Sequence, residues 1–271
     1  MVGMTERAIH LRIQDLLLRF GELVAINRVT FEVPSGDIFA VVGPNGAGKT
    51  AVLNCINGIY RPTSGAILFE GRDITGLPPH RVAQLGIGRS FQHMELFRHM
   101  TVVDNLLLGR HSRMRTGVLT GGVYLGWAKG AEIEHRRRAE EILDFFELYQ
   151  YRETPVAGLP YGVQKLVGVA RALAMEPRLL LLDEPSAGLA REEKEHFARF
   201  LLRIKHELKI TVLWIEHDMQ MVLDLADRMV VLNYGVKIAE GDPREVREDP
   251  DVVVAYLGKH PSLLMAGLGP E

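Results

Sequence analysis

The 271-residue sequence contains a single cysteine, Cys55, so no disulfide bond can form within the chain. That scarcity is typical of proteins that work in a reducing cytosol. No apolar run approaches the length of about 20 residues that a membrane-spanning helix requires. The segment Met1–Gln14 lacks the continuous apolar stretch of a secretory signal. We therefore expect neither a signal peptide nor a transmembrane segment.

A strong excess of either charge is also missing. The 32 Lys and Arg residues against 34 Asp and Glu residues give a formal net charge of −2. Since charge alone would not draw such a chain to DNA or RNA, we expect no nucleic-acid partner. The composition of 47% hydrophobic and 24% charged residues predicts a globular protein with a sizeable core.

Short apolar segments alternate with helical patterns along much of the chain. Ile38–Val42, Leu179–Leu182 and Thr211–Ile215 are runs of the kind that fill a parallel sheet buried on both faces. Helices are predicted for Lys49–Asn57 and for Arg191–Leu208, whose apolar residues fall on one stripe and include Leu208. The alternation predicts an α/β fold with a doubly wound parallel sheet.

Two other regions depart from this alternation. His10–Leu18 and Arg28–Val33 have strand patterns and precede the first parallel strand. From about residue 94 to 159 the pattern is mainly helical, and a helix at Glu132–Tyr149 is expected to bury Ile142, Phe145, Phe146 and Tyr149. Five glycines within Thr116–Gly130 predict a loop insertion, packed or mobile, with a membrane-touching loop as the alternative.

A phosphate-binding loop follows the strand Ile38–Val42. The segment matches G-x-x-x-x-G-K-[ST] and lies between a buried strand and a helix, as that motif requires. Its glycines let backbone N–H groups point at phosphate oxygens, and the following helix adds its positive dipole end. The alternative is a glycine turn followed by an incidental Lys-Thr. The expected ATP-binding residues are Gly43, Pro44, Asn45, Gly46, Ala47, Gly48, Lys49, Thr50 and Ala51.

Two acids, Asp183 and Glu184, end the buried strand Leu179–Leu182. Ligands bind at the carboxyl edge of open α/β sheets, so Asp183 is a candidate Mg²⁺ ligand and Glu184 a candidate general base for water. A helix-capping turn before Pro185 is the alternative. His217 ends another strand at the same edge, where it could hydrogen-bond the γ-phosphate.

The order of these motifs resembles the nucleotide-binding domain of an ABC transporter, over the chain to about Leu257. The resemblance implies a P-loop NTPase (RecA-like) core with an antiparallel β subdomain and an inserted all-helical subdomain. The implied boundaries are 1–93 and 162–257 for the core, 94–161 for the helical subdomain and 258–271 for a tail. It also implies roles for further residues: Phe20 stacking on adenine, Gln92 and Thr50 at Mg²⁺, and Pro160, Tyr161, Gly162 and Gln164 as the signature motif that serves the partner's ATP.

Within that family, the segment 91–102 and the aromatic Tyr161 are similar to the ATPases of branched-chain amino acid importers. That resemblance implies that this chain is a peripheral subunit at the cytoplasmic face of the cell membrane. The implied partners are a second, related ATPase in a heterodimer, two transmembrane permeases and, indirectly, a solute-binding protein. A homodimer is possible for the isolated chain. The alternatives are an importer of urea, amides or polar amino acids, and a soluble ABC ATPase without a transport role.

Two positions depart from the family pattern. Pro160 stands where the signature serine is usual, and Ala190 stands where an acid or amide follows Gly188-Leu189. Proline offers neither a hydroxyl nor an N–H group, so the γ-phosphate contact of the serine is lost. The sequence therefore predicts that one ATP site of a dimer is weaker than the other.

Overall fold

The computed structural model describes residues 8–90, 96–113 and 127–257. The chain forms two compact units. Unit 1 comprises Met1–Pro79 and Ile204–Glu271, and unit 2 comprises His80–Arg203. The divisions predicted at 94 and 161 stay a prediction.

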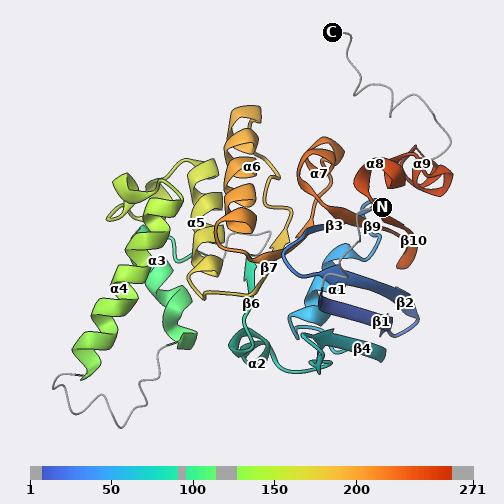
Figure 1. Cartoon of the computed structure of the whole chain (residues 1–271), viewed down its shortest axis with the longest axis horizontal. Coiled ribbons are helices and arrows are strands. Elements are labelled where there is room, and N and C mark those ends of the chain that lie inside the picture. Colours follow the sequence, from blue (N-terminus) through green and yellow to red (C-terminus); the bar gives the residue numbers. More distant parts are fainter. Residues whose placement is uncertain (1–7, 91–95, 114–126, 258–271) are drawn as a thin grey trace, which may run out of the picture. The chain divides into compact units, whose positions relative to one another are not determined.

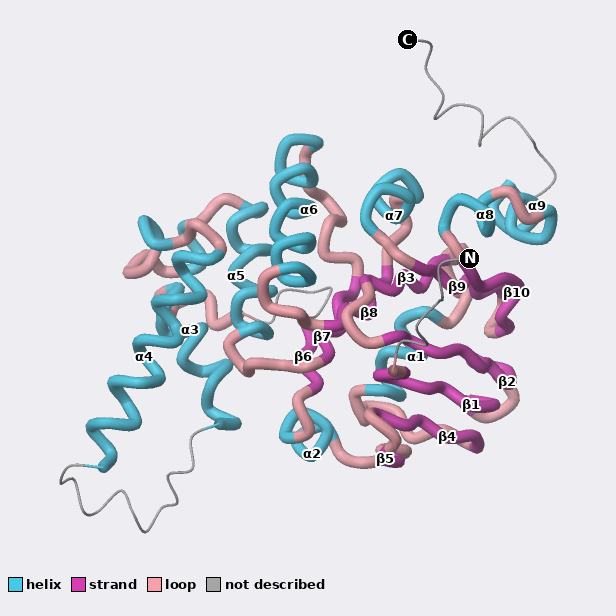
Figure 2. The backbone as a smooth tube through the Cα atoms, in the orientation of Figure 1, coloured by secondary structure: helices cyan, strands magenta, loops and turns pink. Residues whose placement is uncertain are grey.

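Unit 1 contains an antiparallel sheet and a second group of strands that pair mainly in parallel (Figures 1 and 2). The antiparallel sheet has the order β2-β1-β4-β5, and β3 pairs in parallel with β8 on one side and β9 on the other, with β10 antiparallel beyond β9. The bounds of these strands are β1 Ile9–Phe20, β2 Leu23–Pro34, β3 Ile38–Val42, β4 Ser64–Phe69, β5 Arg72–Asp73, β8 Thr211–Ile215, β9 Arg228–Asn233 and β10 Val236–Gly241.

The parallel strands of unit 1 are buried on both faces. All five residues of β3 and all five of β8 are buried, which is why the sequence shows apolar runs there rather than alternation. Phe31 of β2 stacks on Phe39 of β3 with ring centroids 5.5 Å apart, and this contact joins the two layers. The helices of the unit are α1 Lys49–Ile56, α7 Met219–Leu225, α8 Pro243–Arg247 and α9 Pro250–Leu257.

Unit 2 combines a two-stranded parallel ladder with helices. β6, Ile87–Ser90, pairs with β7, Leu179–Asp183. α3, α4 and α5 pack together. Phe146, the residue directly after α4, has its ring centroid 5.1 Å from that of Phe200 in α6. The helices are α3 Val102–Gly109, α4 Trp127–Phe145 and α5 Tyr161–Leu173, while α2 Pro79–Gln84 and α6 Arg191–His206 each extend across a division between the units.

Several predicted elements are confirmed and others need correction. β3 and β8 have the predicted bounds, whereas α4 begins at Trp127 inside the predicted loop 116–130, of which residues 116–126 lie outside the described part. Tyr149 was expected to be buried but is 60% exposed, because α4 ends at Phe145 and the chain turns at Glu147 with a φ of 58°. Leu208 is likewise exposed, since α6 ends at His206.

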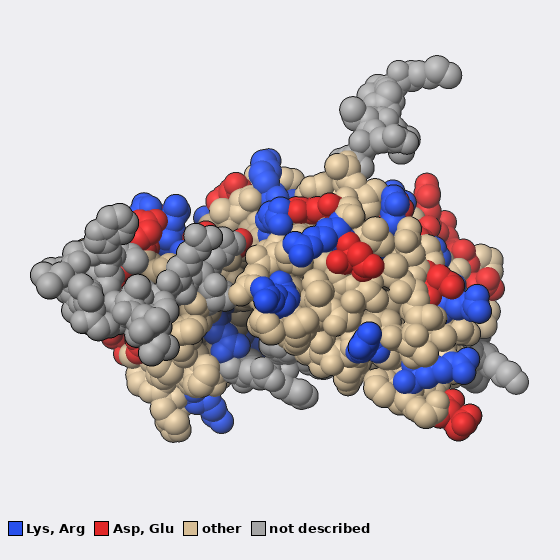
Figure 3. Space-filling model, turned by 90° about the horizontal axis from the view of Figure 1, so that it is seen from below, with Lys and Arg blue, Asp and Glu red and all other residues tan. Residues whose placement is uncertain are grey.

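The surface carries both charges. On the face shown in Figure 3, Lys and Arg side chains are interspersed with Asp and Glu side chains, as the net charge of −2 leads one to expect. No helix of the described residues has the length and apolar character needed to cross a membrane.

Candidate functional site

The loop between β3 and α1 curls tightly through glycines in the left-handed region. Gly43, Gly46 and Gly48 have φ values of 144°, 80° and 98°, a region that favours glycine. Steric crowding also requires glycine at two of these positions. A Cβ on Gly43 would clash with the carbonyl oxygen of Leu232, and one on Gly48 would lie 2.6 Å from the carbonyl oxygen of Ala25. Neighbouring strands therefore fix the loop in its closed shape.

Lys49 begins α1 and keeps its ammonium group inside the loop. Its Nζ donates to the carbonyl oxygens of Gly43 at 2.7 Å and of Pro44 at 3.0 Å. Gly48, the N-cap residue, has no side chain to cap the first N–H groups of α1. A cation, a helix N-terminus and a curled backbone thus share one loop, which is an arrangement suited to phosphate groups.

A hairpin of unit 1 supports this loop from behind. At the turn between β9 and β10, Gly235 donates from its N–H to the carbonyl oxygen of Ala47 at 3.0 Å and accepts from the N–H of Asn27 at 2.8 Å. From α9, Tyr256 packs against the core beneath β3, and burial raises the pKa of its hydroxyl to about 12 while the Gly43 backbone acts in the opposite direction.

Phe20, the predicted adenine contact, is the last residue of β1. Its side chain is 47% exposed, so one part of the ring is open to a ligand. Tyr60 packs edge-on against it, with centroids 5.2 Å apart and an interplanar angle of 79°. An exposed ring fixed by a second aromatic ring suits stacking on a base.

His217 lies beyond the carboxyl end of β8, and the phosphate loop leaves the carboxyl end of the adjacent strand β3. Unit 1 thus brings the loop and His217 to one edge of the parallel strands. The fully buried Glu216 accepts from the N–H groups of His217 at 2.8 Å and Asp218 at 3.2 Å, and its Oε1 is 3.3 Å from His217 Nδ1. The His217 side chain itself is 53% exposed. Glu216 was not predicted, and its only sequence signal is an acid directly before His217.

Asp183 and Glu184 end β7 in unit 2. Asp183 is the last strand residue, and Glu184 has a φ of 46°, so the chain turns sharply between the two carboxylates. Asp183 Oδ2 accepts from Nη2 of Arg89 on β6 at 3.0 Å. Arg89 was not predicted to have a role, because its place on the buried strand β6 is a finding of the structure.

The signature residues form the start of α5. Pro160 occupies the N-cap position without a side-chain hydrogen bond, whereas Gln164 donates from Nε2 to the carbonyl oxygen of Leu159 at 2.8 Å. Pro160 and Tyr161 are exposed, and Gly162 is buried. The space beside Gly162 is filled by the Glu193 carboxylate of α6. Gln92 lies outside the described residues.

A loop of this kind after a buried parallel strand defines a P-loop nucleotide-binding protein. The sequence model described as "ABC transporter" matches residues 26–187, and the one described as "Branched-chain amino acid ATP-binding cassette transporter" matches residues 236–261. The chain is 39% identical over 249 residues, 92% of this chain and 98% of the relative, to the high-affinity branched-chain amino acid transport ATP-binding protein LivG of Salmonella typhimurium strain LT2.

Solved structures agree with this assignment. The crystal structure of a nucleotide-free ATP-binding cassette from an ABC transporter has a TM-score of 0.81 and 34% identity, covering 93% of this chain and all of that one. A dimeric ATP-binding cassette in a post-hydrolysis state, bound to ADP and Pi, has a TM-score of 0.72 and 25% identity, covering 86% and 99%. The chain belongs to the ABC transporter family, and it is an ATP-binding subunit with ATPase activity. Such subunits dimerise and pair with transmembrane permeases.

Proposed function

We propose that this subunit powers the uptake of branched-chain amino acids. In this proposal the subunit is bound peripherally at the cytoplasmic face of the membrane. The observation that carries the proposal is the agreement of two comparisons, one with a family model and one with a relative. Residues 236–261 match the branched-chain cassette model, and the relative with 39% identity over 92% of the chain carries the same solute in its name. A solute-binding protein and two permeases would select the solute.

In the proposed cycle, the phosphate loop holds ATP and Phe20 stacks on its adenine. Magnesium is usually held by one or two carboxylates together with substrate phosphates. The Thr50 hydroxyl, the Asp183 carboxylate and the Gln92 amide are oxygen donors of the required kind. When bound, Mg²⁺ would neutralise phosphate charge and orient the terminal phosphate.

Hydrolysis in this proposal is the task of Glu184 and His217. Glu184 accepts a proton from the attacking water, and His217 donates a hydrogen bond to the γ-phosphate. Loss of the γ-phosphate removes contacts that hold two ATP-bound subunits together, so the dimer opens. The backbone fit of the loop and the position of Lys49 support the phosphate end of this cycle.

Lys49→Ala tests the assignment of the phosphate site. Lys49 is the side-chain cation inside the loop, so its loss should remove most of the electrostatic stabilisation of the γ-phosphate. Mg-ATP binding by calorimetry should fall by at least tenfold, and turnover should fall with it. Wild-type affinity and turnover in this variant would refute the site.

We further propose a heterodimer with a second ATPase, in which the two sites are unequal. In a head-to-tail dimer, Pro160 of this chain would serve the partner's ATP, and the partner's signature motif would serve the ATP on Lys49. Proline lacks the hydroxyl that would contact the γ-phosphate, and a hydrogen bond to a charged group contributes about 1.5–3 kcal/mol. The exposure of Pro160 at the start of α5 is compatible with contact to another subunit.

Pro160→Ser tests the unequal sites. A homodimer of this chain would carry Pro160 in both sites, so its ATPase rate should be low and should rise about tenfold on substitution by serine. Pro243→Ser, at the start of α8 in unit 1, is the control and should leave the rate unchanged. Equal rates for wild type and Pro160→Ser would contradict the asymmetric arrangement.

A further inference from the structure

Asp183 is not isolated at the end of its strand but paired with an arginine. In the parallel ladder of β6 and β7, Arg89 is opposite Leu181. Asp183 lies two residues beyond Leu181 and thus on the same face of the ladder, because side chains alternate with a period of two. The register therefore places the guanidinium group beside the carboxylate, with Nη2 and Oδ2 3.0 Å apart.

The pair is buried, which makes it costly to break. The side chains of Arg89 and Asp183 are 4% and 2% exposed. Arginine keeps its charge at ordinary pH and presents its donors in a rigid, planar arrangement. A charge-assisted hydrogen bond between two side chains anchored on neighbouring strands holds the carboxylate in one orientation.

We propose that Arg89 is the positioning residue for Asp183 at the Mg²⁺ site. This inference rests on the proposed function, in which Asp183 is a magnesium ligand. Arg89 orients the carboxylate and ties it to β6. Groups that orient metal ligands from behind commonly change metal affinity by about 10–100-fold when they are removed.

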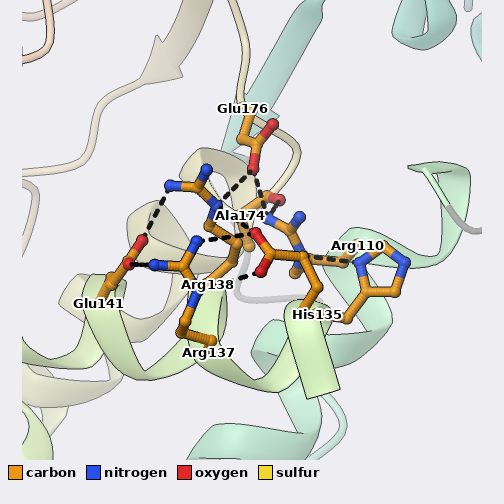
Figure 4. Close-up of polar contacts among 8 residues, drawn as sticks. Arg110, His135, Arg137, Arg138, Glu141, Ala174 and Glu176 are labelled. Atoms are coloured by element: carbon orange, nitrogen blue, oxygen red, sulfur yellow. Dashed lines mark hydrogen bonds and ion pairs between the residues drawn. The ribbon is translucent and has the colours of Figure 1, made fainter. Parts of the chain in front are cut away.

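The test compares Arg89→Met with Arg110→Met in the full chain. Arg110 belongs to the same unit, its side chain is also 4% exposed, and its Nη1 donates to Glu176 and to the carbonyl oxygen of Ala174, each at 3.0 Å. Figure 4 shows this cluster, which includes His135 and Arg138 but not Asp183. Each variant thus loses one buried, paired arginine of unit 2.

The decisive readout is the Mg²⁺ concentration that gives half of the full ATP-induced rise in melting temperature. Arg89→Met should raise this concentration about tenfold or more, while ATP affinity in EDTA stays within about twofold of wild type. Arg110→Met should lower the melting temperature without changing the Mg²⁺ dependence. An unchanged Mg²⁺ requirement in Arg89→Met, or an equal shift in Arg110→Met, overturns the inference.

Arg89→Lys keeps the test decisive if Arg89→Met does not fold. Lysine retains the charge but not the planar set of donors, so a several-fold rise in the Mg²⁺ requirement is expected and an unchanged requirement refutes the role.

Asp183→Asn separates this inference from the proposed function. If Asp183→Asn leaves the Mg²⁺ requirement unaltered, the proposed metal site is wrong; if only the Arg89 variants behave as wild type, the positioning role alone is wrong.

Discussion

At the scale of single residues, the proposed nucleotide site combines fixed and exposed side chains. Lys49 is buried within its loop, where two carbonyl oxygens hold its ammonium group. Phe20 is 47% exposed and is fixed on one side by Tyr60. The phosphate end would therefore supply charge, and the base end would supply an apolar surface.

Phe20→Ala should weaken ATP binding several-fold or more. Stacking of a base on an aromatic side chain contributes about 1–3 kcal/mol by alanine substitution. Phe20→Tyr should be mild, and GTP should bind appreciably, because stacking does not read base edges. Calorimetric titration checks these results. Leu23 lies opposite Phe20 in the same hairpin and is also exposed, so Leu23→Ala is the control and should leave ATP affinity unchanged. Equal ATP affinity in wild type and Phe20→Ala would exclude Phe20 from the site.

The site residues that could be predicted from the sequence are those whose chemistry is carried by a local motif. The phosphate loop is of this kind, because a strand, a spaced set of glycines and Lys49-Thr50 occur within a few residues. Arg89 and Gly235 were missed for a common physical reason. Arg89 acts through a contact set by strand register, and Gly235 acts through a turn that meets a distant loop; single-sequence patterns do not encode such pairings. Glu216 bonds the backbone N–H groups of the next two residues, and no local motif marks that role.

At the scale of elements, the β9–β10 hairpin acts as a support for the phosphate loop. Gly235 at its turn has a φ of 78°, and a Cβ there would lie 2.8 Å from the carbonyl oxygen of Ala25. Its backbone bonds both Ala47 of the loop and Asn27 of β2. A shift of this turn should therefore disturb the loop that holds the phosphates.

Gly235→Ala should reduce both stability and ATP affinity. Gly71, at the β4–β5 turn, is the matched control, since its φ is 76° but nothing lies within 4 Å of a Cβ there. Gly71→Ala should lower the free energy of unfolding by about 1–2 kcal/mol through backbone strain alone. Urea unfolding should show a larger loss for Gly235→Ala, and only this variant should bind ATP more weakly. Equal effects of the two substitutions would show that the hairpin does not support the loop.

The elements that could be predicted from sequence are those with a strong local pattern. β3 and β8 were found with their bounds because parallel strands buried on both faces are continuous apolar runs. β10 was missed because its residues are mostly half-buried and alternate weakly, so its place depends on pairing with β9. The start of α4 was misplaced because the glycines at 126 and 130 indicate a loop, whereas the helix begins at Trp127.

At the scale of the whole molecule, the proposed ATP-driven switch needs a second subunit. The signature residues at the start of α5 are proposed to serve another chain's ATP, and Pro160 and Tyr161 are exposed there. A dimeric cassette among the related structures is bound to ADP and Pi. Because ATP would join two subunits in this proposal, nucleotide binding and subunit association should depend on each other.

The most direct measurement is the mass of Glu184→Gln in solution, with and without Mg-ATP. Loss of the general base should slow hydrolysis by roughly 10²-fold or more while ATP binding persists. This variant should be monomeric alone and dimeric with Mg-ATP, and a second substitution, Lys49→Ala, should abolish the dimer. A Glu184→Gln chain that hydrolyses ATP at the wild-type rate and keeps one mass under both conditions would contradict the ATP-driven dimer.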